Sequence, residues 1–304
     1  MAQALEQLAR QQQTLAGIAG VVRTMKSLAA VNAAPYERAA SAIEAWRQTV
    51  RRGFAAYAWR MGEPVPSDPA PAHCDIVAVF GSDHGFCGNH NSAVAQMLQR
   101  ARAMAGTRPP VVLCVGARMA AALQEHGIAV TALLMPPASA DGIGRVAGEV
   151  VALVERHSRG RPLARLAVKL AFMRRAAHGS RAPVLATLLP LPPALLQRPR
   201  RWPGPALPDF AGPPQAVLAA LVRAHLFASV FHASAEAMVT ENAARLARMQ
   251  QAEQALDERL ALLGRQISGV RQDQITDELM DIVVGHMPAP GRRTRAPVDA
   301  GHGP

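Results

Sequence analysis

Apolar and small residues recur at alternating steps of three and four near the N-terminal end of the chain. Residues 1–34 contain no proline, and after Pro35 the repeat resumes as far as Val50. This spacing places the apolar side chains on one stripe of a helix. The stripe consists of Leu5, Leu8, Leu15, Ala19, Val22, Met25, Ala29, Tyr36, Ala39, Ile43, Trp46 and Val50. The pattern predicts a helix over residues 1–62 that Pro35 kinks or interrupts.

A second stripe with the same spacing occupies residues 215–287, which contain no proline. It continues from Val217 to Val270 with one slip after Leu256. Sustained apolar spacing of this kind is typical of a coiled coil. About 70 helical residues would extend roughly 100 Å, more than a compact domain can use. We therefore expect this helix to run outside a globule and to pair with the N-terminal helix.

The middle of the chain, residues 73–190, has short apolar runs that alternate with helical stretches. The expected strands are 76–80, 111–115, 129–135, 166–172 and 184–189, and the expected helices lie near 91–105, 117–125 and 144–157. Continuous apolar strands separated by helices predict a largely parallel sheet with both faces covered. A Pro-rich connector over residues 191–214 and a disordered basic tail over residues 288–304 complete the plan.

The composition excludes some classes of protein and leaves others open. A hydrophobic content of 50% is too high for a disordered chain. The net charge of +11 raises the hypothesis of a basic coiled coil that binds nucleic acid. Lys26 and Lys169 are the only lysines, so scattered arginines carry nearly all of the charge, and aromatic residues that stack on bases make up only 4%. No uninterrupted apolar run reaches the roughly 18–20 residues of a membrane span, so we expect a cytoplasmic protein.

A local cluster of His84, Cys87 and His90, with His73 and Cys74 nearby, is a candidate metal site. A structural zinc site needs four converging ligands, and no second ligand pair follows downstream. The three cysteines are widely spaced and odd in number, which indicates reduced thiols rather than a disulfide framework. We therefore expect no resident metal, although a small metalloenzyme remains a hypothesis.

The glycine-rich run Gly81–Asn89 follows the first expected strand, where nucleotide-binding sheets place a phosphate loop. It has neither the lysine of a P-loop nor the G-x-G-x-x-G spacing. We interpret Gly85, Cys87 and Gly88 as residues of a tight structural turn. Ser82, Asp83 and His84 are adjacent in sequence, which is not the spatial relay of a catalytic triad. The sequence thus predicts no catalytic, cofactor-binding or metal-binding residues.

The polar run Arg271–Leu279 interrupts the apolar character of the C-terminal helix. Arg271, Gln274 and Glu278 share one helical face by their spacing, and Gln272 and Thr276 share another. The run is either a solvated helix end or a polar surface on which another protein docks.

Four motifs, in order along nearly the whole chain, resemble the gamma subunit of F-type ATP synthases. Residues 240–249 (TENAARLARM) are similar to that family's S-E-x-A-A-R-M-x-A-M. Residues 271–285 resemble its R-Q-x-x-I-T-x-E-L-x-E-I-V-x-G. Residues 82–91 resemble S-D-R-G-L-C-G-G-x-N, and residues 21–29 resemble I-T-K-A-M-K-M-V-A.

The resemblance implies a fold in which an antiparallel coiled coil of both termini carries an inserted Rossmann-like α/β domain. It implies a non-catalytic rotor shaft inside a ring of alternating alpha and beta subunits, with epsilon and the membrane c-ring at the α/β domain. Ion flow through the membrane ring would turn the shaft and drive ATP synthesis, or hydrolysis would turn it in reverse. Carried over by position, the subunit contacts are Arg271, Gln272 and Thr276, with Glu278 in the same motif. Met25 and Lys26 match the N-terminal side of this collar.

Several positions depart from the family pattern. The arginine of the glycine-rich turn is His84 here, the second glycine of its pair is Asn89, and Thr240 replaces a serine. We infer a divergent version, compatible with an alternative ATPase coupled to Na⁺ or H⁺. The resemblance also implies a peripheral location on the cytoplasmic face of the bacterial inner membrane.

Overall fold

The computed structural model describes residues 2–62, 76–104, 109–158, 166–176, 179–198, 201–202 and 204–285. The basic tail that we predict over residues 288–304 lies outside these residues, as do His73 and Cys74 of the candidate metal cluster.

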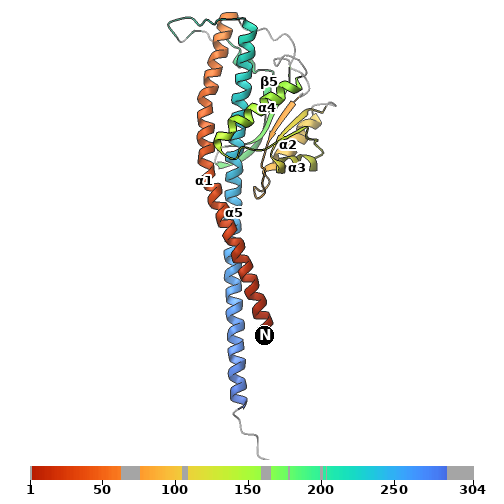
Figure 1. Ribbon diagram of the computed structural model, residues 1–304, viewed down its shortest axis with the longest axis vertical. Helices are drawn as coiled ribbons and strands as arrows, with labels where there is room; N and C mark the ends of the chain where they lie inside the picture. Colours follow the sequence, from red (N-terminus) through yellow and green to blue (C-terminus); the bar gives the residue numbers. More distant parts are fainter. Residues whose placement is uncertain are drawn as a thin grey trace, which may run out of the picture. The chain divides into compact units, whose positions relative to one another are not determined.

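Two long helices lie at the ends of the described chain (Figure 1). Helix α1 spans Ala2–Met61 with 60 residues, and helix α5 spans Pro214–Gly285 with 72 residues. Both expected helices are therefore present, and the C-terminal one runs without a break.

We predict that Pro35 kinks or interrupts the first helix; the interruption does not occur, because α1 continues through Pro35. A proline inside a helix leaves the carbonyl of the residue four positions earlier without its donor. That residue is Val31, whose side chain is 70% exposed, so water has access to this side of the helix. The residue after the proline, Tyr36, is buried, and its hydroxyl donates a hydrogen bond of 3.2 Å to the carbonyl of Pro137. Tertiary packing next to the proline thus stabilises the helix against the local loss.

The segment between the long helices forms a five-stranded sheet in the order β3-β2-β1-β4-β5. The strands are β1 (Ile76–Phe80), β2 (Val111–Val115), β3 (Ala132–Leu134), β4 (Val168–Arg175) and β5 (Arg181–Leu189). The first four are parallel, and β5 is antiparallel to β4. This confirms a largely parallel sheet. The third strand is shorter than expected, while β4 and β5 extend beyond their predicted ends toward the hairpin that joins them.

Successive side chains of the strands enter two separate cores. On one face the strands pack against α2 (His90–Met104) and α3 (Ala117–Glu125), for example through Val94 and Met119. On the other face they pack against α4 (Ile143–His157) and against the long helices, for example through Phe54 and Leu226. Because both faces are covered, β1 and β2 are apolar at every position, which is the pattern by which the sequence predicts them. Strands β4 and β5 also carry polar residues, among them Lys169 and Arg181. Two short 3₁₀ turns, η1 (Ala140–Gly142) and η4 (Pro193–Leu195), complete the described elements.

The chain divides into two compact units, and the division cuts both long helices. The first unit combines Met1–Val21 with Glu253–Pro304, and the second is Val22–Ala252, which contains the whole sheet. Each unit is described by itself below.

In the second unit, α1 and α5 pack against each other in antiparallel directions. The ring of Phe54 meets the edge of His225 at 6.1 Å between centroids. Earlier on α1, Tyr36 packs in one cluster with Val239, which is later on α5. Gly53 permits the close approach, since a Cβ at that position would lie 2.7 Å from Cδ2 of Leu221. The predicted antiparallel helix pair is therefore present here.

In the first unit, the predicted stripe positions of both helices are buried or half-buried. Ala19 and Leu263 are buried, with exposures of 2% and 1%. Other stripe members are half-buried, namely Leu5, Leu8 and Leu15 on α1 and Leu256, Leu260, Ile267 and Val270 on α5. In the second unit the stripe prediction is wrong for Trp46, which is 50% exposed. The buried line there passes through Ile43 and Val50, and their spacing of seven leaves Trp46 to one side.

Both long helices contain an 18-residue window apolar enough for a membrane span by length and composition, with mean hydropathies of 1.2 and 1.6. Buried helices of soluble proteins have the same composition. Helix α5 places Val222, Leu226 and Val230 in the core against the sheet. Only 17% of the window on α1 and 33% of the window on α5 is buried inside the protein, so this packing accounts for a part of these apolar residues.

Replacing Phe54 with alanine should strongly destabilise the second unit, because its side chain is fully buried between the sheet and α5. We expect a loss of about 3–5 kcal/mol in the free energy of unfolding, measured by denaturant titration. Trp46→Ala is the matched control on the same helix and should cost less than about 1 kcal/mol. Equal losses in the two variants would contradict this assignment of the core.

Candidate functional site

The C-terminal part of α5 carries the polar residues that the sequence singled out. Arg271, Gln272, Thr276 and Glu278 are all exposed. The hydroxyl of Thr276 donates a hydrogen bond of 2.9 Å to the carbonyl of Gln272, one turn earlier. This bond keeps the Thr276 hydroxyl close to the helix backbone, while the side chain of Gln272 is exposed. The four residues lie on one continuous helical segment in the first compact unit.

Large apolar side chains are exposed on the same segment. Five of them have exposures between 55% and 61%: Ile275, Leu279, Met280, Ile282 and Val283. Scattered apolar residues on a surface need no explanation, but these five lie within nine positions and form a group of exposed apolar side chains. Polar groups and apolar surface therefore occur together at this end of α5, as on a surface that docks to another protein.

Met25 and Lys26, the other predicted contacts, are half-buried on α1. They belong to the second compact unit, whereas the four predicted residues of α5 belong to the first. Met25 is a member of the apolar stripe, which accounts for its partial burial without a contact to another protein.

The glycine-rich turn after β1 is held by a local network of hydrogen bonds. The backbone N–H of Ser82 donates to Oδ1 of Asn91 at 3.0 Å, and Nδ2 of Asn91 donates to the Ser82 hydroxyl at 2.8 Å. That hydroxyl lies 3.2 Å from Sγ of Cys87. Oδ1 of Asp83 accepts a bond of 3.0 Å from the backbone of Ala117, the first residue of α3. The motif residues thus stabilise the turn and cap a helix.

The glycines of this turn differ in their roles. Gly88 has a positive φ of 64°, and a Cβ there would lie 2.8 Å from Nε of Arg248 on α5. Gly85 has open space around it and no positive φ. The non-glycine residue in the left-handed region is Phe86, with a φ of 66° and a side chain that is 64% exposed. Of the three predicted turn residues, Gly88 and the buried Cys87 lie where α5 approaches the turn.

The motif around Thr240, about 150 residues after this turn, lies against the end of the sheet. Thr240 is fully buried, and its hydroxyl lies 2.8 Å from the carbonyl of Glu236 on its own helix and 3.2 Å from the carbonyl of Met173 on β4. Nη1 of Arg181 on β5 donates to the carbonyl of Thr240 at 3.1 Å. Burial raises the pKa of the next residue, Glu241, and the opposing charge and hydrogen bond of Arg245 partly offset this effect. The motif is therefore the place where α5 is bonded to the end of the sheet.

Arg175, the last residue of β4, links the sheet to both long helices. Its Nη2 donates to Oε1 of Glu236 on α5 at 2.6 Å, and its Nη1 donates to Glu37 on α1 at 3.4 Å. Burial by itself would raise the pKa of Glu236, but the hydrogen bond and charge of Arg175 bring that pKa below its usual value. Glu236 is 5% exposed, so its carboxylate depends on this partner. The sequence does not indicate this pairing, because an Arg and a Glu that are separated by 61 positions form no local pattern.

The candidate metal ligands do not converge within the described part of the chain, where no three His, Cys, Asp or Glu side chains are grouped to hold an ion. The side chain of His84 is 83% exposed and lies 4.0 Å from Asp83. Cys87 bonds within the turn instead. Ser82 is likewise engaged with Asn91, so the Ser82–His84 run is not a catalytic relay in the structure.

A five-stranded α/β domain inserted between two long helices, which are antiparallel where they pack beside the sheet, defines the class of protein by its fold. The comparisons with known proteins agree with this class. The protein-family model described as ATP synthase matches residues 4–287. The chain is 26% identical over 215 residues to the ATP synthase gamma chain of Chromobacterium violaceum, covering 69% of this chain and 72% of that relative.

Solved structures share the fold at low sequence identity. The rotor of the Euglena gracilis mitochondrial ATP synthase matches with a TM-score of 0.56 and 14% identity, covering 90% of this chain and all of that one. The central stalk of the Tetrahymena thermophila mitochondrial ATP synthase matches with a TM-score of 0.53 and 17% identity, covering 76% and 99%. The chain belongs to the ATP synthase family, as a gamma-type, non-catalytic rotor subunit of the central stalk. Nothing in these matches supports the nucleic-acid alternative.

Replacing Glu236 with glutamine tests the link between α5 and the sheet. Because the pKa of Glu236 is lowered in the folded state, its charge stabilises the protein above the ordinary value of 4.5, and this contribution is lost as the pH falls through the lowered pKa. We expect E236Q to lower the free energy of unfolding by about 1–2 kcal/mol at pH 7, since Arg175 is partly exposed.

The measurement is denaturant unfolding of wild type and E236Q between pH 3 and pH 8. Burial also lowers the pKa values of His90 and His225, to about 4 in each case, so both proteins lose stability in acid as these imidazoles become protonated. The informative quantity is therefore the difference between the two proteins, which should shrink at the acid end. A difference that stays constant with pH would contradict the ion pair.

Proposed function

We propose that this subunit transmits torque between an ion-translocating ring in the membrane and a head of alternating alpha and beta subunits through the C-terminal segment of α5. The observation that carries the proposal is the joint exposure of polar and apolar side chains on this segment. Arg271, Gln272, Thr276 and Glu278 would supply hydrogen bonds to loops of the head. Met25 and Lys26 would supply the contacts from α1.

The physical demands of a rotor explain why such contacts are few. Each net hydrogen bond contributes only about 0.5–1.5 kcal/mol, so a small set can hold an angular position and still release it. Torque must also pass along the shaft without being absorbed by bending. Helix α5 suits this demand because its 72 residues contain no break and its stripe packs in both compact units.

The exposed apolar residues of this segment would face the bore of the head, where a smooth apolar lining lets the end of the shaft turn. They are Ile275, Leu279, Met280, Ile282 and Val283. The α/β domain would contact the epsilon subunit and the c-ring at the membrane end. The Tetrahymena thermophila neighbour comes from a structure of a central stalk with its c-ring, which supports this orientation by analogy.

The subunit belongs to a membrane-associated complex as a peripheral component. We place it at the cytoplasmic face of the bacterial inner membrane, in keeping with the bacterial origin of the curated relative. The coupled ion, H⁺ or Na⁺, is selected by the membrane ring and not by this chain.

Substituting the polar contacts should weaken coupling without unfolding the subunit. Gln272→Ala and Thr276→Ala are expected to lower the ATPase activity of the reconstituted complex by about 2- to 10-fold each, as the loss of one hydrogen bond predicts. Gln266→Ala, an exposed glutamine on the same helix, is the matched control and should retain full activity. Full activity in all three variants would contradict the proposed contacts. Circular dichroism of the isolated chains checks that each variant is folded.

Polar substitutions at the apolar end should impair assembly. Ile275→Ser and Leu279→Ser replace side chains that are each 58% exposed, so the isolated chain should keep its stability. On co-expression with alpha and beta subunits, wild type should elute from a sizing column in a complex with one copy per ring, whereas the double variant should elute mostly apart. A wild-type chain that never joins the ring would overturn the rotor proposal itself.

A further inference from the structure

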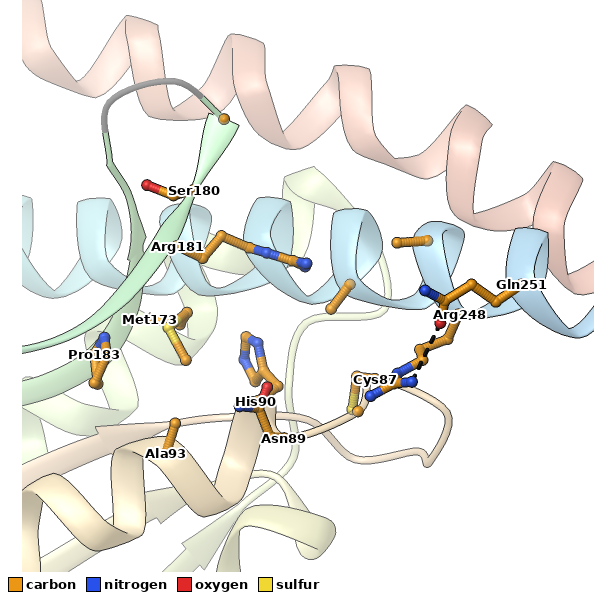
Figure 2. Close-up of a pocket in the computed structure, with 14 residues that line it drawn as sticks. Cys87, Asn89, His90, Ala93, Met173, Ser180, Arg181, Pro183, Arg248 and Gln251 are labelled. Atoms are coloured by element: carbon orange, nitrogen blue, oxygen red, sulfur yellow. Dashed lines mark hydrogen bonds between the residues drawn. The ribbon is translucent and has the colours of Figure 1, made fainter.

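A pocket of about 490 Å³ lies where four parts of the second compact unit meet. Its walls come from the glycine-rich turn, the start of α2, the beginning of β5 and helix α5 (Figure 2). The polar side chains that matter here are His90, Ser180, Arg181, Arg248 and Gln251. None of the lining residues, all in the described part of the chain, is acidic, so the pocket is basic in character.

The position of the pocket in the sheet is one at which α/β proteins bind ligands. From β1 the chain continues through α2 to β2, while β4 lies on the opposite side of β1. The connections therefore diverge between β1 and β4, which leaves a crevice at the carboxyl ends of these two strands. The turn after β1 and Met173 near the end of β4 both line the pocket. The N-terminus of the 15-residue helix α2 lies in the same place, and such helix ends attract anions.

His90, the first residue of α2, supplies an independent sign of a missing ligand. The residue is 2% exposed, and its Nε2 atom has no hydrogen-bond partner among the described residues. A buried polar atom without a partner costs roughly 1–3 kcal/mol. Figure 2 shows the imidazole rising from the start of α2 into the pocket, on the side that faces Arg181. A ligand that accepts a hydrogen bond would remove this cost.

Two guanidinium groups reach the pocket from different elements. Nη1 of Arg181 donates to the carbonyl of Thr240 at 3.1 Å, and Nη1 of Arg248 donates to Oε1 of Gln251 at 3.2 Å. Each arginine is oriented by one bond and retains further N–H donors of its five. The charge of Arg181, together with that of Arg245, reinforces the burial that lowers the pKa of His90 to about 4. The imidazole is therefore neutral at pH 7 in a positive potential, and its Nε2 can carry a proton to donate.

We propose that this pocket binds a small solute through a phosphate group, with Arg181, Arg248 and Nε2–H of His90 as the donors. Guanidinium groups match the geometry of phosphate oxygens and form charge-assisted hydrogen bonds with them. The volume leaves room for more than one phosphate group. A bound phosphate would connect α2, β5 and α5, and would thus tighten the junction between the sheet and the long helix. The site is separate from the C-terminal contacts of α5 and does not depend on the proposed coupling role.

The test is calorimetric titration of the purified full-length chain with inorganic phosphate and with pyrophosphate, at constant ionic strength set by chloride. We expect saturable binding at one site per chain, tighter for pyrophosphate. Arg181→Gln and Arg248→Gln should each weaken binding about 10-fold, as the loss of a charge-assisted bond predicts. Arg118→Gln removes one exposed charge from α3, away from the pocket, and should change the affinity less than about 2-fold.

A second readout reports on the atom that motivates the site. Phosphate binding should raise the pKa of His90, which is visible as a shift of its imidazole resonances in an NMR titration, while the resonances of the distant His225 should not respond. His90→Phe should abolish this effect and weaken binding. Because this variant replaces a buried residue and can misfold, the affinities of Arg181→Gln and Arg248→Gln test the proposal independently of it. Absence of saturable binding at millimolar phosphate and pyrophosphate would overturn the proposal. Equal weakening by Arg118→Gln would also overturn it, because the attraction would then be diffuse.

Discussion

The structure depends on one stretch of α5 that is buried on nearly every side. From Leu226 to Asn242 this helix packs against the sheet and α1 at once, so its surface must be small or apolar almost all round. The alanines Ala228, Ala233, Ala235 and Ala237 meet this requirement and let neighbouring elements approach closely. Most of the buried polar groups there have a hydrogen-bond partner, which for Glu236 is Arg175 of β4 and for Asn242 is the carbonyl of Met238 on the same helix. Ser234 is an exception, because its hydroxyl has no partner among the described residues.

This burial gives α5 two different characters along one uninterrupted helix. Its middle is joined to the sheet by core packing and by a small set of buried hydrogen bonds, which makes the α/β domain and this part of the shaft one unit. Its C-terminal segment, as far as residue 283, has exposed polar and apolar side chains. The torque path that we propose uses both properties, because torque would enter where the helix is fixed and would leave where the helix contacts other subunits. The phosphate pocket that we propose lies on the fixed side, at the junction itself.

Much of the fold could be predicted because its elements carry local patterns. The strands Ile76–Phe80 and Val111–Val115 and the helix Ala117–Glu125 have the bounds that the apolar runs indicate. Where prediction failed, tertiary contacts outweighed a local preference. Pro35 remains helical beside the buried Tyr36, and Trp46 is exposed because the buried line follows Ile43 and Val50. Of the site residues, the polar run at the end of α5 could be found by motif, whereas the bond between Arg175 and Glu236 and the unpartnered nitrogen of His90 could not.

By itself the sequence determined the order of the elements, the two helical stripes, the covered sheet and the family resemblance. Each of these follows from the types and spacing of residues that are near one another in the chain. The tertiary structure alone decided which distant residues meet. It placed the turn at Gly88 against Arg248, bonded the carbonyl of Thr240 to Arg181 of β5, and enclosed a basic pocket around His90. The physical reason is that the burial and pairing of a side chain depend on the residues that surround it in space. The sequence around a single arginine, glutamate or histidine does not indicate which distant residue will be its partner.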